Sequence, residues 1–153
     1  MYRLTIALVA AMISPPALAV NVTFSGTLSG ICTLAVPTPG TLGLAAGGDV
    51  LGSATGGTPA TVTVVSIGSN TITVDPPTWN SLPGGYNAAG EVLEVAYSGL
   101  GGLSLINQDY TDQTSDFGIL ALPLTSLTVN ARVTNPNGFE AGTYQMQVVV
   151  TCS

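Results

Sequence analysis

Short segments in which apolar and polar residues alternate run through most of the chain, and they are separated by Gly, Pro and Asn. A period of two places every second side chain on one face of a β-strand, so these segments predict strands with one buried face. No window has the 3.6-residue period and capping residues of a helix. We therefore expect an all-β protein, an immunoglobulin-like sandwich of two antiparallel sheets. The expected strands are 20–29, 31–36, 41–45, 60–67, 70–75, 91–97, 102–107, 117–121, 124–134 and 142–151.

The first nineteen residues have the form of a secretion signal. Arg3 precedes an apolar run from Leu4 to Ile13, and Ala17-Leu18-Ala19 has the small residues that signal peptidase prefers. The run is shorter than the roughly 20 residues that span a bilayer, so we expect cleavage after Ala19 and no membrane insertion. The expected organisation is a signal peptide at 1–19, an amino-terminal strand at 20–28 and one sandwich domain at 29–153.

Charge and composition exclude several classes of partner and of catalytic site. After cleavage Arg132 is the one basic residue against eight acidic residues, and the chain contains neither histidine nor lysine. Nucleic acids and anionic lipids bind clustered cations, so neither is an expected partner. The Ser-His-Asp triad, histidine and cysteine zinc sites, Schiff-base lysines and phosphate-binding loops all need residues that are missing here.

Carboxylate groups are the remaining candidates for metal binding or catalysis. Asp109, Asp112 and Asp116 lie in the polar stretch 107–116, where oxygen ligands for calcium are conceivable, but their spacing matches no standard calcium loop. These aspartates, or Glu91 with Glu94, are also candidates for glycoside hydrolysis, yet nothing in the sequence brings two carboxylates into one cleft. We expect a solvated connection at 107–116 and no metal, cofactor or catalytic site.

Cys32 and Cys152 are the two cysteines of the chain. An even number of cysteines in an exported protein predicts one disulfide, with two free thiols as the alternative. The bridge would hold the strand after the amino-terminal segment against the end of the last strand, and closing so long a loop contributes about 4–5 kcal/mol in the chain-entropy model.

Both ends of the exported chain alternate with particular regularity. On one face of the first strand the alternation places Val20, Val22, Phe24, Gly26 and Leu28. On one face of the last strand it places Tyr144, Met146, Val148, Val150 and Cys152. The predicted disulfide lies after the first of these strands, so residues 20–28 are free to pack outside their own domain.

The segments FSGTLSGIC, residues 24–32, and AGTYQMQVVVTCS, residues 141–153, resemble the two ends of chaperone–usher pilus subunits and of the related spore coat protein U-like subunits. Members of that family are sandwiches that lack one strand, and the amino-terminal strand of the next subunit fills the gap, a form of β-augmentation. The resemblance implies a homopolymeric surface filament, assembled with a periplasmic chaperone and an outer-membrane usher. It also implies that residues 20–28 are the donated strand, that Gly26 permits close backbone approach, and that Tyr144, Met146, Val148 and Val150 line the accepting groove.

Two alternatives remain open at this point. Residues 20–28 can form an ordinary first strand of their own domain. The loop DPPTWNSLPGGY, residues 75–86, carries Trp79 and Tyr86, which either stack on sugar rings in a monomeric adhesive module or cover the open end of the core.

Overall fold

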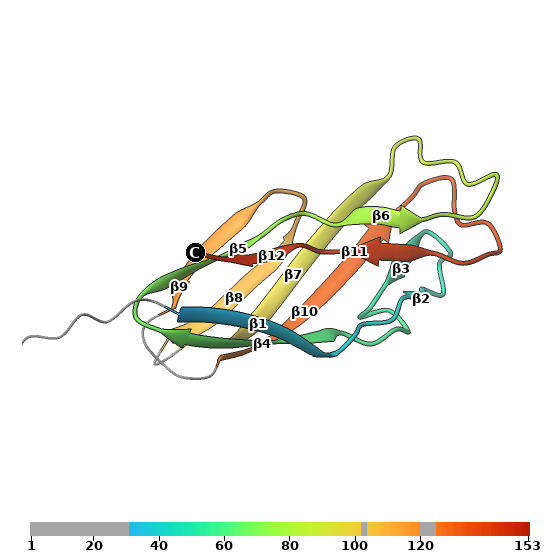
Figure 1. The fold of residues 1–153 in the computed structure, drawn as a ribbon. Coiled ribbons are helices and arrows are strands. Elements are labelled where there is room, and N and C mark those ends of the chain that lie inside the picture. Colours follow the sequence, from blue (N-terminus) through green and yellow to red (C-terminus); the bar gives the residue numbers. More distant parts are fainter. Residues whose placement is uncertain (1–30, 102–103, 120–124) are drawn as a thin grey trace, which may run out of the picture.

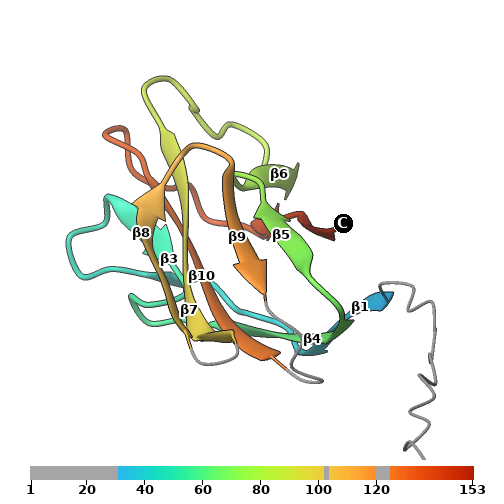
Figure 2. The same cartoon turned by 90° about the vertical axis from the view of Figure 1, so that its left-hand side faces the viewer.

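A computed structural model describes residues 31–101, 104–119 and 125–153. The described residues form two packed layers of antiparallel strands (Figures 1 and 2) and contain no helix, so none of them forms a helix that could cross a membrane. The prediction of an all-β, immunoglobulin-like sandwich is confirmed.

One edge strand of the larger layer is β1 (Ile31–Thr38), which pairs with β4 (Ala60–Ile67). From there the sheet continues through β10 (Thr125–Thr134), β7 (Val92–Gly101) and β8 (Ser104–Thr111). Beyond the part of β10 that pairs with β4, β10 pairs with the short strand β3 (Val50–Gly52), and β3 pairs in turn with β2 (Gly43–Leu44).

The smaller layer ends in the last strand of the chain. Here β5 (Asn70–Val74) lies between β9 (Ser115–Ile119) and β12 (Val150–Cys152). The same two segments pair again further along, as β6 (Thr78–Ser81) with β11 (Gln145–Gln147). In Figure 1 the segment with β5 and β6, drawn in green, and the segment with β11 and β12, drawn in red, run above β1 and β4.

The core lies between the layers and is built by the alternation that the sequence shows. Val62 and Val64 of β4, and Ile72 and Val74 of β5, point inward while their neighbours point to solvent. Tyr97 is also buried, and its hydroxyl is 2.9 Å from the Ser115 hydroxyl, so its polar group is satisfied. The sandwich is therefore closed along most of its length by ordinary apolar packing.

Three expectations from the sequence are wrong in detail. The predicted last strand, 142–151, is two short strands, β11 and β12, because the pairing is interrupted at Val148 and Val149. Trp79 lies on β6 rather than on a loop. The predicted connection at 107–116 is mostly strand, with residues up to Thr111 in β8 and those from Ser115 in β9.

Candidate functional site

Two strand edges face each other along one side of the sandwich. In the described part of the chain β1 pairs only with β4 and β12 pairs only with β5, so each has one edge with no neighbouring strand. Figure 1 shows β1 and the β11–β12 segment running along the same side of the molecule. Unpaired strand edges are templates for another strand.

The open edge of β12 presents specific main-chain groups. Asp75 N–H donates to the Val149 carbonyl at 3.0 Å, and Ser153 and Thr71 exchange two bonds at 2.7 and 3.0 Å. Because residues of an antiparallel strand alternate between its two edges, the N–H and C=O groups of Val150 and Cys152 point the other way, toward β1. These groups can hydrogen-bond an added strand.

An apolar groove of about 340 Å³ lies between the two edges. Leu34 and Val36 form the β1 wall, and the Val36 side chain is 60% exposed. The floor comes from the larger sheet, and the opposite wall comes from the last segment of the chain. The floor and opposite-wall residues include Ala60, Val62, Val129, Ala131, Met146, Val148 and Val150.

A more polar recess adjoins the groove and shares some of its lining residues. Asn80, Gln145 and Tyr144 line this recess together with Gly40, Thr41 and Leu42, which border both spaces. Asn80 Nδ2 donates to Gln145 Oε1 at 3.4 Å across it. Three of the four residues assigned to the groove wall from the sequence, Met146, Val148 and Val150, line the apolar groove, whereas Tyr144 lies outside any strand and lines only the recess.

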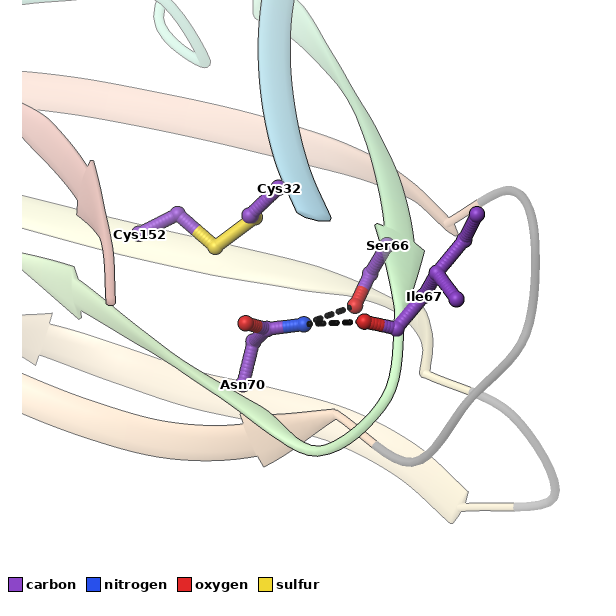
Figure 3. Close-up of a disulfide and its surroundings, with 5 residues drawn as sticks. All are labelled: Cys32, Ser66, Ile67, Asn70 and Cys152. Carbon is purple, nitrogen blue, oxygen red and sulfur yellow. Dashed lines mark hydrogen bonds between the residues drawn. A yellow bond between two sulfur atoms is a disulfide. The ribbon is translucent and has the colours of Figure 1, made fainter. Parts of the chain in front are cut away.

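The opposite end of the groove is bounded by the disulfide between Cys32 and Cys152, which confirms the predicted pairing. Each cysteine lies two residues from a groove residue, Leu34 in β1 and Val150 in β12, and the two Cα atoms are 6.2 Å apart. Figure 3 shows the bridge beside Ser66 and Asn70. Asn70 Nδ2 donates to the buried Ser66 hydroxyl at 2.6 Å, which ties the end of β4 to the start of β5 there.

The predicted donor residues Val20, Val22, Phe24, Gly26 and Leu28 lie outside the described residues. The described residues therefore include only the surface that the family resemblance predicts to be the acceptor. Leu34 and Val36 and the floor residues were not identified from the sequence. The alternation in β1 was the available signal for Leu34 and Val36, but only the paired sheets show that a groove exists between β1 and β12.

Trp79 and Tyr86 belong to an aromatic cluster at the far end of the sandwich from the disulfide. Their ring centroids are 5.9 Å apart, and Tyr144 packs on both rings at 5.8 and 5.4 Å. Phe139 stacks on Tyr86 at 6.0 Å. The Trp79 indole N–H donates to Glu91 Oε1 at 3.0 Å and the Tyr86 hydroxyl donates to Glu91 Oε2 at 2.5 Å. The cluster thus packs around the carboxylate of Glu91, which the sequence suggests as a candidate for catalysis.

This environment changes the acidity of Tyr86. Burial, together with the hydrogen bond to Glu91, raises the pKa of the Tyr86 hydroxyl from 10.0 to about 12. Burial also raises the pKa of Tyr144, whose hydroxyl donates to the Glu140 carbonyl at 2.8 Å. Both shifts favour the neutral phenol, which is the hydrogen-bond donor in each contact.

The other acidic residues do not form a site together. Glu94 pairs with Arg132, with 2.7 Å between Oε2 and Nε, and the same guanidinium lies 3.9 Å from the Tyr110 ring centroid. Asp109, Asp112 and Asp116 are exposed, and among the described residues no group of three acidic or sulfur ligands is placed to hold a metal ion.

Comparison with protein-family models, with curated proteins and with solved structures gives no match to this chain. The groove and its two strand edges are therefore the features that bear on function.

Proposed function

We propose that this protein is a structural subunit of a bacterial surface filament, and that its groove accepts residues 20–28 of another copy. The observation that carries the proposal is the apolar groove of about 340 Å³ with an unpaired strand edge on each side. A strand is the element that satisfies both features, because its main chain pairs with the edges while alternate side chains enter the groove.

The amino-terminal segment has the matching chemistry. Its Val20, Val22, Phe24 and Leu28 side chains fall on one face, with Asn and Thr on the other. Burying one such side chain contributes about 1.5–3 kcal/mol, so three or four of them contribute about 5–12 kcal/mol before ordering costs. That is comparable with the whole stability of an ordinary domain, about 5–15 kcal/mol, so an occupied groove is strongly favoured over an empty one.

The length of the groove also agrees with a short strand. The wall from Tyr144 to Val150 is seven residues of nearly extended chain, which corresponds to about 20 Å. A strand of that length presents three or four alternate positions to the groove, and the first four on the apolar face of the segment are Val20, Val22, Phe24 and Gly26. Gly26, without a side chain, suits a place where two backbones approach closely.

The proposal extends to assembly and location. An exposed apolar groove with free edges invites unwanted pairing, so a subunit of this kind needs a chaperone until its groove is filled. The predicted signal peptide and the disulfide are compatible with export through the periplasm, where a periplasmic chaperone and an outer-membrane usher would deliver subunits to the surface.

The direct test is a chain-terminator experiment. A variant that lacks residues 20–28 keeps its groove and loses its donor, so adding it in increasing proportion to the intact chain should shorten the filaments seen by electron microscopy. A second variant, Phe24→Asp, should act the same way because it would bury a charge in an apolar groove. Filaments whose length is independent of both variants would refute the proposal.

A further inference from the structure

The groove has two different ends. At one end Gly40, Thr41 and Leu42 line both the apolar groove and the polar recess beside it. At the other end the covalent bridge joins β1 to β12 with 6.2 Å between the Cα atoms of Cys32 and Cys152. Figure 3 shows this bridge passing directly from the start of β1 to the end of β12.

No third strand fits between the two backbones at the bridge. A strand lies about 4.8 Å from each neighbour it pairs with, so two strands that flank a third are about 9.6 Å apart. The 6.2 Å separation at Cys32 and Cys152 is well below that distance, and the bridge prevents it from widening. A strand in the groove therefore cannot continue between the two backbones past the bridge and stays on the recess side of it.

The chain's own donor segment begins at the closed end. Residue 30 is joined to Ile31, the first residue of β1, and Ile31 is next to Cys32. To reach its own groove, the segment 20–28 would have to turn at Ser29-Gly30, a dipeptide typical of turns, and run back between β1 and β12 past the disulfide.

We infer that the Cys32–Cys152 disulfide bars the chain's amino-terminal strand from its own groove and so directs that strand to a second copy; this inference rests on the proposed function. Such a barrier favours polymerisation over insertion of the strand into its own groove. A tethered segment meets its own groove at an effective concentration in the millimolar range, far above the concentration of other copies, so self-insertion would otherwise compete strongly with polymerisation. A second copy's strand occupies the groove on the recess side and never passes the bridge.

The test distinguishes insertion within a copy from insertion between copies. A photoreactive residue, p-benzoylphenylalanine, replaces Phe24 in isotopically heavy and light preparations of the exported chain. The two are unfolded together with the disulfide intact, refolded as an equal mixture, irradiated, and analysed by mass spectrometry for cross-links to Met146, Val148 and Val150. The same experiment is done with the double variant Cys32→Ala, Cys152→Ala, and with folded protein treated with a reductant.

With the disulfide intact, about half of the groove cross-links should join a heavy to a light copy, as random pairing between copies requires. In the double variant this fraction should fall to below about a twentieth, since the tethered segment then outcompetes other copies. Cross-links confined to single copies in the oxidised protein would overturn the inference even if the double variant failed to fold. An equal mixed fraction in oxidised, reduced and cysteine-free protein would overturn it as well. An absence of groove cross-links in every preparation would instead refute the proposed function, and the inference with it.

Discussion

At the scale of single residues, Trp79 shows how a side chain that looks available for binding is used for packing. Its ring contacts Tyr86 and Tyr144, and its N–H is bound by Glu91. We expect Trp79→Ala to lower the free energy of unfolding by about 2–3 kcal/mol, somewhat less than for a fully buried aromatic residue. Trp79→Phe keeps most of the ring and loses one hydrogen bond, so it should cost only about 1 kcal/mol. Urea denaturation of the three proteins measures both values, and an alanine variant as stable as the wild type would contradict the packing role.

The same cluster predicts a pH dependence at the residue scale. The pKa of Tyr86 is raised from 10.0 in the unfolded chain to about 12 in the folded protein. The folded state therefore binds the phenolic proton more tightly, and the stability it contributes is fully present below pH 10 and is lost as the pH rises toward 12. Tyr86→Phe removes this ionisation. Denaturation curves from pH 8 to 12 should show a smaller alkaline loss of stability in the variant, and equal losses would contradict the assignment.

At the scale of secondary-structure elements, the last segment of the chain offers a matched pair of substitutions. Val148 lines the groove, whereas its neighbour Val149 is 48% exposed and its carbonyl accepts a hydrogen bond from Asp75 N–H, just after β5. Val148→Asp should abolish polymerisation because it places an unpaired charge in the apolar wall. Val149→Asp carries the same charge on the outer face and should leave polymerisation intact. Sedimentation of assembled protein measures both, with circular dichroism as a check on folding; equal effects of the two variants would contradict the assigned wall.

The strands also show which parts of the fold and of the groove can be predicted from the sequence and which cannot. Alternation located β4 at its observed bounds and placed Met146, Val148 and Val150 on one face of a strand, because one-sided burial leaves a local pattern. It missed β3 and β6, which are short and are defined by pairing with the distant β10 and β11. The groove itself could be expected only from the family resemblance. A groove exists where two strand edges have no strand between them, and that arrangement produces no periodic pattern in the sequence.

At the scale of the whole molecule, the disulfide joins residues 120 positions apart and thus encloses nearly the whole domain. In the chain-entropy model a loop of this length contributes about 5 kcal/mol. We expect reduction to lower the urea midpoint of unfolding substantially, with the cysteine-free variant insensitive to the reductant as the control. An unchanged midpoint after verified reduction would show that the sheets hold together without the bridge.

The central claim is that the groove between β1 and β12 is filled by the amino-terminal strand of another copy. Hydrogen exchange of the exported chain, combined with electron microscopy of the same preparation, tests it most directly. The account predicts filaments in which the amides of residues 20–28 and those of Val150 and Cys152 exchange slowly, and loss of protection at Val150 and Cys152 when residues 20–28 are deleted. A stable monomer in which residues 20–28 are protected within their own sheet would contradict it.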